Sequence, residues 1–244
     1  IPNKNLTKET VSNVTCSVED ILKPTSVAVI LDTRDSSLEI LDWICEGFSE
    51  NIEVINYGIL PSGSMPVLLE NFGHNLGIII SASHNPSEYN GIKLIDENGS
   101  KLQDEIEIEI ETNIENISLP SAHTSYKESE EGFKVYFEFL NQILDFDLTN
   151  FDLLIDSANG SAYKIIDELL KDNDSKFKMI ANEPNGENIN LASGATHTEN
   201  LIKNLKKGEI GAAFDGDADR LIMVDENGIT CNGDILILLI AKYL

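Results

Sequence analysis

Short apolar runs alternate with amphipathic segments along the first half of the chain. A short, β-branched run is typical of a strand buried in a sheet, whereas apolar residues three and four positions apart predict a helix. The patterns predict strands at residues 27–32, 52–57, 76–81 and 92–96, and helices at residues 37–49 and 67–72. Residues 103–115 alternate acidic residues with isoleucine, so the period alone fits strand or helix; we favour an acidic helix.

A polar segment at residues 118–131 interrupts this pattern and is the best candidate for a domain boundary. Beyond it the alternation restarts, with strands predicted at residues 151–156, 177–181, 210–214 and 221–224, and helices at residues 133–144, 163–170, 198–206 and 234–244. The pattern predicts an α/β protein with two tandem units, which we place at residues 1–125 and 126–244. Each unit has a ligand-type loop at the carboxyl end of a buried strand, where open α/β sheets bind ligands.

The chain is strongly acidic, with a formal net charge of -25 over 244 residues and 41% hydrophobic residues to build a core. Such a charge repels nucleic acid and anionic membrane surfaces, so neither is expected as a partner. If a protein of this charge binds a phosphate ester, it needs a local positive site. A metal ion, an arginine or backbone amides can supply one.

Cysteine usage and the chain ends bear on where the protein works. Cys16, Cys45 and Cys231 are widely spaced and form no CxxC pair, which argues against a disulfide framework or a zinc site and fits a reducing cytoplasm. The first residues show no signal-peptide pattern, and no apolar run is long enough to span a bilayer. The sequence starts without methionine and stops inside an apolar stretch, so we expect a longer protein. Its oligomeric state, a homodimer included, stays open.

A serine-rich loop, Ser-Ala-Ser-His-Asn-Pro at residues 81–86, directly follows a predicted buried strand. Its small residues and Pro86 favour a tight turn with Ser83 at the tip. A serine hydroxyl is a weak nucleophile that needs a base or a cation beside it, and His84 and Lys93 are the nearest candidates. Taken alone, the loop fits a purely structural turn with a capping histidine equally well.

An aspartate-rich loop follows the strand predicted at residues 210–214. Asp215, Asp217 and Asp219 alternate with small residues, so their carboxylates can converge on one hard cation such as magnesium or calcium. A calcium-binding EF-hand is excluded, because its loop needs glycine at the sixth position, which is Arg220 here. A phosphatase in which Asp215 itself is the nucleophile stays open, although it leaves the serine loop without a role.

The chain has only two arginines, Arg34 and Arg220, and each follows a turn that contains aspartate. The planar guanidinium group matches phosphate or carboxylate in a way that lysine does not. A structural ion pair is the alternative role for Arg34. For Arg220 the adjacent aspartates favour a role in ligand binding.

Together the two loops resemble those of the α-D-phosphohexomutase superfamily. Residues 81–86, with the Asn-Gly-Ile-Lys segment that ends at Lys93, are similar to its phosphoserine loop, and residues 215–220 to its metal loop. Residues 183–190 and 194–197 are most similar to those of the phosphoglucosamine mutase branch. The resemblance implies two tandem three-layer α/β domains with mixed sheets, a phosphoserine-loop domain and then a metal-binding-loop domain, which form the N-terminal half of a four-domain enzyme.

The resemblance also implies a reaction and the residues that perform it. Glucosamine 6-phosphate and glucosamine 1-phosphate would interconvert through a phosphoserine enzyme and a bisphosphate intermediate. The phosphate on Ser83 would complete the coordination of Mg²⁺ by the three aspartates, and the implied catalytic residues are Ser83, His84, Lys93 and Arg220. Phosphomannomutase or phosphoglucomutase activity, or an inactive fragment that binds a phosphosugar or a cation, are the alternatives.

Overall fold

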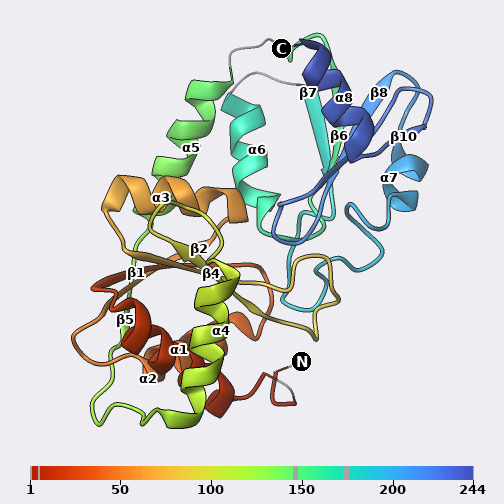
Figure 1. Ribbon diagram of the computed structural model, residues 1–244. Helices are drawn as coiled ribbons and strands as arrows, with labels where there is room; N and C mark the ends of the chain where they lie inside the picture. The colour runs from red at the N-terminus through yellow and green to blue at the C-terminus, as the bar shows by residue number, and fades with distance from the viewer. Residues whose placement is uncertain (1, 5, 145–147, 173–175, 244) are drawn as a thin grey trace.

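The computed structural model describes residues 2–4, 6–144, 148–172 and 176–243, which form two α/β units (Figure 1). The sheet of the first unit has the strand order β4-β3-β1-β2-β5. Its strands are β1 (Ser26–Leu31), β2 (Glu53–Ile59), β3 (Leu76–Ile80), β4 (Ile92–Asp96) and β5 (Tyr126–Glu128). Because β4 runs antiparallel to β3 while the other pairs are parallel, this sheet is mixed, as predicted.

Helices cover both faces of the first sheet, which gives three layers. One face packs against α1 (Lys8–Leu22), α2 (Ser37–Gly47) and α4 (Asp104–Asn113), and the other against α3 (Met65–Phe72) and α5 (Glu131–Ile143). Alternate residues of β1 serve the two cores, because successive strand side chains point to opposite faces. Val27, Val29 and Leu31 pack in the first core, and Ala28 and Ile30 in the second.

The second sheet is also mixed, with the order β10-β9-β8-β6-β7. Parallel strands β6 (Asp152–Asp156), β7 (Lys176–Ile180) and β8 (Glu209–Phe214) are extended by antiparallel β9 (Leu221–Val224) and β10 (Thr230–Cys231). Helix α6 (Ala162–Asp172) lies on one side of this sheet and α7 (Glu199–Asn204) on the other (Figure 1). The last helix, α8 (Gly233–Tyr243), has no buried residue.

The predicted strands and helices are present, with bounds shifted by a few residues, and the ambiguous segment at 103–115 contains the helix α4. The prediction omitted α1, β5 and β10. Strand β5 pairs with β2, so the first sheet draws on residues beyond 125; the division at residue 125 stays a prediction. Leu244, the last residue of the predicted final helix, lies outside the described residues. Within the described part of the chain, no helix has the length and hydrophobicity of a membrane span.

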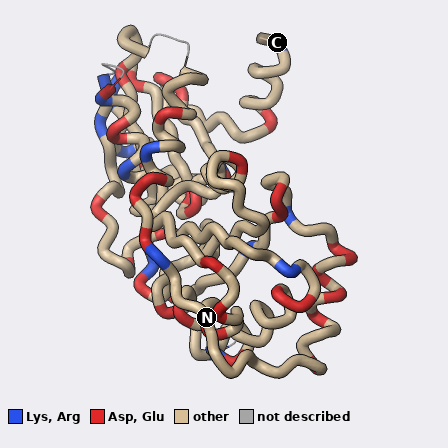
Figure 2. Tube along the Cα trace, turned by 90° about the vertical axis from the view of Figure 1, so that its left-hand side faces the viewer, with Lys and Arg blue, Asp and Glu red and all other residues tan. Residues whose placement is uncertain are grey.

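The sheet topology places the serine loop beside the turn after β1, and loop contacts connect the first unit to the second. In the first sheet β1 lies between β2 and β3. The chain therefore passes from β1 to β2 on one side of β1, and then crosses to β3 on the opposite side. The turn after β1 and the serine loop after β3 therefore start side by side, at the kind of position where open α/β sheets bind ligands. Loop contacts join the units: Ser62 N donates to Asp217 O at 2.9 Å, and Asp35 N to Gly186 O at 3.2 Å. Acidic residues are spread over both units (Figure 2).

Candidate active site

The serine loop and the aspartate loop meet at Ser83. Its hydroxyl donates a hydrogen bond of 2.6 Å to Asp215 Oδ2, from the first unit to the second. Ser83 has φ of 50°, a left-handed conformation that is uncommon for serine. Its backbone N–H donates to Ser81 Oγ at 2.9 Å, which supports the turn. With 9% of its surface exposed, Ser83 lies at the junction of the units rather than on an open loop tip.

The three aspartates form a compact acidic cluster. Each offers a carboxylate oxygen, and these oxygens lie within 4.8 Å of one another. Asp215 and Asp217 are buried, whereas the Asp219 side chain is 39% exposed and opens the cluster to solvent. Asp217 Oδ1 is buried and has no hydrogen-bond partner among the described residues. An unpartnered oxygen in a set of carboxylates fits a hard divalent cation.

Lys93 is the cation that this cluster contacts most closely. Its Nζ donates to Asp217 Oδ2 at 2.6 Å and to Asp219 Oδ2 at 3.1 Å. Burial opposes the charge of Lys93, but these hydrogen bonds outweigh it and raise its pKa above the ordinary value. Burial likewise opposes ionisation of Asp217, yet the contact with Lys93 lowers its pKa.

Asp215 differs from Asp217 in its electrostatic surroundings. Burial is the main influence on Asp215 and raises its pKa, while the hydrogen bond from Ser83 favours the carboxylate and partly offsets that effect. The charges of Asp217 and Asp219 add to the increase. A divalent cation placed in the cluster would remove this repulsion, because it favours the ionised form of all three groups.

The other two predicted catalytic residues are placed less tightly. Arg220 N donates to Asp215 Oδ1 at 3.2 Å, but the Arg220 side chain is 52% exposed and its Nε lies 3.9 Å from Asp215 Oδ2. Arg220 Nε also lies 3.7 Å from Asp219 Oδ1, so the half-exposed guanidinium group is at the rim of the acidic cluster, where a ligand can reach it. His84 has a buried Nδ1 with no hydrogen-bond partner in the described part of the chain.

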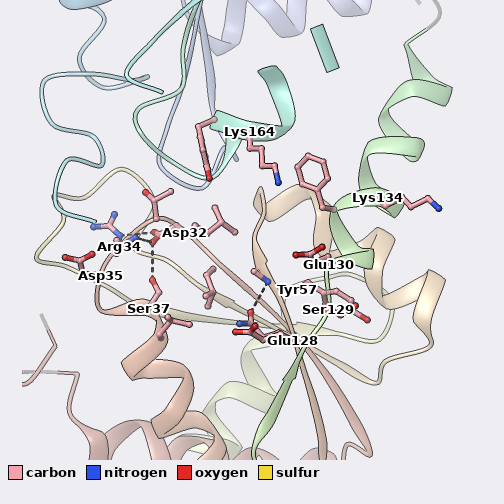
Figure 3. A pocket seen from close by; sticks show the side chains of 18 residues that line it. Asp32, Arg34, Asp35, Ser37, Tyr57, Glu128, Ser129, Glu130, Lys134 and Lys164 are labelled. Atoms are coloured by element: carbon pink, nitrogen blue, oxygen red, sulfur yellow. Dashed lines mark hydrogen bonds and ion pairs between the residues drawn. The ribbon is translucent and has the colours of Figure 1, made fainter. Parts of the chain in front are cut away.

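Arg34 has the structural role that the sequence left as the alternative. Its Nε donates to Asp32 Oδ2 at 2.8 Å, and both side chains are fully buried. The pair lines one wall of a cavity of about 630 Å³ between the ends of β1 and β2 and the starts of α5 and α6 (Figure 3). Ser83 and the three aspartates do not line this cavity.

Two further residues touch the site and were not found from the sequence. Ser62 Oγ donates to Asp217 Oδ2 at 2.8 Å, and Asn190 Nδ2 donates to Ser83 O at 2.8 Å. Ser62 lies in the turn after β2, and Asn190 in the loop between β7 and α7. Asn190 belongs to residues 183–190, which carry part of the family resemblance, and this resemblance is the sequence signal that points to Asn190.

The sequence matches two consecutive domains of a known family. Residues 1–121 match the phosphoglucomutase/phosphomannomutase α/β/α domain I, and residues 134–228 match α/β/α domain II. The chain belongs to the phosphoglucomutase/phosphomannomutase family. The order of the two matched domains agrees with the order of the serine loop and the aspartate loop.

Relatives within this family are phosphoglucosamine mutases. Those of Clostridium kluyveri and Clostridium tetani are 38% and 39% identical and align with 100% of this chain. The phosphoglucosamine mutase of Lactobacillus helveticus is 41% identical over 89% of it. The chain spans 58%, 57% and 50% of the lengths of these relatives.

Solved structures agree with the fold. A phosphoglucomutase/phosphomannomutase family protein from Burkholderia thailandensis aligns with a TM-score of 0.83 at 23% identity, covering 99% of this chain and 56% of its own. The open form of parafusin, a phosphoglucomutase from Paramecium, aligns with a TM-score of 0.72 at 21% identity, covering 93% of this chain and 50% of its own. At these identities the likeness is one of fold.

Proposed function

We propose that this chain is the N-terminal half of a phosphoglucosamine mutase, which interconverts glucosamine 6-phosphate and glucosamine 1-phosphate. The observation that carries the proposal is the 2.6 Å hydrogen bond from the Ser83 hydroxyl to Asp215 inside the acidic cluster. The phosphoglucosamine mutase relatives support a hexosamine phosphate as the substrate. The three free cysteines support a reducing compartment, the cytoplasm, as the place of action.

The cofactor that fits is magnesium, held by Asp215, Asp217 and Asp219 together with the phosphate on Ser83. Carboxylate oxygens are the ligands that this hard cation prefers, and the unpartnered Asp217 Oδ1 is a suitable donor. Bound magnesium would neutralise charge on the phosphoryl group. The chain's own contribution is alignment, because phosphoryl transfer needs positioning and electrostatic stabilisation more than covalent chemistry from the protein.

In the transfer itself, the bond between phosphorus and Ser83 Oγ breaks as a bond to a sugar hydroxyl oxygen forms. The leaving Ser83 Oγ receives a proton, supplied in net terms by the attacking sugar hydroxyl, and the resulting hydroxyl donates a hydrogen bond to Asp215 Oδ2, the arrangement of the unphosphorylated protein. Lys93 stays charged and neutralises the phosphate, while exposed Arg220 steadies the outer phosphoryl oxygens. His84 is the candidate that takes up the proton of the attacking hydroxyl. In the second transfer the Ser83 hydroxyl attacks the other phosphate of the bisphosphate; the bond between that phosphorus and its sugar oxygen breaks, and the sugar oxygen takes up the proton that Ser83 releases.

Phosphorylation and turnover of the full-length protein test this proposal. Intact-mass measurement should find one phosphate on Ser83, and the enzyme should prefer glucosamine phosphate to the glucose and mannose phosphates. Ser83→Ala should lose the phosphate and reduce turnover by several orders of magnitude, whereas Ser87→Ala in the same loop should retain both. A phosphate removed by hydroxylamine would instead indicate an acyl phosphate on Asp215 and refute the serine mechanism.

A further inference from the structure

The backbone carbonyl groups of the serine loop converge on two side chains from opposite units. Ser83 O accepts from Arg34 Nη2 at 3.0 Å and from Asn190 Nδ2 at 2.8 Å. Asn85 O accepts from the same two atoms, at 2.8 Å and 3.0 Å. Each donor thus bridges both carbonyls. Two carbonyl acceptors also fix which end of the Asn190 amide faces the loop, since only its nitrogen donates.

Arg34 is fully committed to this loop and cannot bind a ligand. Its Nη1 donates to Tyr89 O at 2.9 Å and to Pro86 O, and its Nε donates to Asp32. A guanidinium group has five N–H donors, and the Arg34 contacts occupy all of them. The side chain has no exposed surface, and the buried Asp32 balances its charge. Figure 3 shows Arg34 lying beside Asp32 at the end of β1.

Asn190 brings the second unit to the same point. It is 6% exposed and has φ of 58°, and its N–H donates to Ala158 O at 2.8 Å in the loop after β6. Its Oδ1 is buried without a partner among the described residues, so the amide is held chiefly by the two donations to the serine loop. Gly216 allows this approach, because a Cβ there would lie 2.6 Å from Ser83 O and 2.9 Å from Asn190 Nδ2.

A left-handed serine needs such support. This conformation costs an L-residue roughly 1–2 kcal/mol, so it persists only where the surroundings impose it. At Ser83 it directs the hydroxyl to Asp215. We infer that Arg34 and Asn190 are positioning residues, a two-sided carbonyl clamp that holds Ser83 in its left-handed conformation with the hydroxyl aimed at the acidic cluster. The effect of the clamp on phosphoryl transfer rests on the function proposed above; its effect on the loop does not.

Hydrogen exchange in the full-length protein tests the clamp without reference to activity. Asn190→Ala removes both Asn190 donations, so protection of the Ser83 and Asn85 amides should fall roughly fivefold, as for the loss of about 1 kcal/mol of hydrogen bonding. Asn188→Ala is the matched control. It lies in the same loop, and its Nδ2 donates to Glu183 O instead of the serine loop, so protection at Ser83 should stay unchanged.

Arg34→Lys provides a second variant, which keeps a positive charge beside Asp32 but lacks the planar fork of five donors and so cannot reproduce all of the Arg34 contacts. It too should reduce protection at Ser83, in protein shown to be folded by circular dichroism. Unchanged protection in both variants would overturn the inference. If wild type proves inactive on hexose phosphates while the variants still lose protection, the proposed function fails and the clamp stands.

Kinetics then measure what the clamp does for the reaction. Misplacing Ser83 by about 1 Å should lower kcat by roughly 10²-fold in Asn190→Ala, with KM within about twofold of wild type. Asn188→Ala should match wild type in both constants. A mainly structural role would instead leave kcat of the folded variant at the wild-type value, and that result would contradict the positioning role.

Discussion

The substitution Gly160→Ala, which adds one methyl group, tests whether the site needs the close approach of the loop after β6 to the aspartate loop. A Cβ there would lie 2.4 Å from Gly216 O and 2.7 Å from Gly216 Cα, between Asp215 and Asp217. The approach is fixed by a hydrogen bond of 2.8 Å from Ser161 N to Gly216 O. Gly160 does not have positive φ, so alanine can adopt its backbone conformation and only the contact is at stake.

The expected size of the effect follows from these distances. Ordinary contact begins at 3.4 Å and the Cβ would stand at 2.4 Å, so the loops must separate by about 1 Å (3.4 minus 2.4). Both atoms of Gly216 are backbone, so no side chain can rotate away. Overpacking of this kind costs about 1–3 kcal/mol, and a reacting group displaced by about 1 Å costs about 10²-fold in rate.

The assay compares Gly160→Ala with Gly233→Ala in the full-length enzyme. A Cβ at Gly233 would meet no atom within 4 Å, so this control adds the same methyl group without a contact. Gly160→Ala should lower kcat by roughly 10²-fold and require more magnesium for half-maximal activity, while urea unfolding shows a folded protein. Wild-type kcat and magnesium dependence in Gly160→Ala would refute the idea that this spacing sets the geometry of the acidic cluster.

Two further predictions concern His74 and Lys93. Burial lowers the pKa of His74 from 6.5, with Glu53 opposing, so the stability that the neutral imidazole contributes is present above pH 6.5 and lost as pH falls below it. His74→Gln should therefore weaken the fall in urea midpoint between pH 7.5 and 5.5, unlike His123→Gln on the surface. Lys93→Met should destabilise the metal-free protein by roughly 1 kcal/mol, because it leaves Asp217 unneutralised, and magnesium should stabilise this variant more than wild type. The first expectation fails if the urea midpoint of His74→Gln falls with pH as steeply as that of wild type. The second fails if magnesium raises the melting temperature of Lys93→Met and of wild type by the same amount.

The sequence predicted the strands and both loops because their signals are local. A β-branched run such as residues 76–81 can bury two faces only as a strand inside a sheet, and alternating aspartates predict a metal-type loop whatever surrounds them. Helix α1 has a local signal as well, because Val11, Val14 and Val18 are spaced to form one helical face. Its serine, threonine and valine residues are weak helix formers, and packing against α2 compensates for them.

The rest of the site depends on contacts between distant segments. Asn190 lies 107 residues from Ser83, and Ser62 lies 155 residues from Asp217, so no local pattern pairs them. The role of Arg34 could not be read from residue type either, because the same guanidinium fork that matches phosphate also matches backbone carbonyls. Strand β5 is too short and polar for its pattern to show, and it exists because the edge of β2 offers it hydrogen-bond partners.

The central claim is that Ser83 and the three aspartates form one metal-dependent site. Phosphorus NMR of the phosphorylated full-length protein tests it most directly, with manganese added at a small fraction of the protein concentration. If the phosphate on Ser83 completes the metal coordination, its resonance should broaden beyond detection, since paramagnetic broadening falls steeply with distance from the ion. Asp217→Asn should restore a sharp line at the same manganese concentration. A phosphoserine resonance that manganese leaves unchanged in wild type would contradict the shared site.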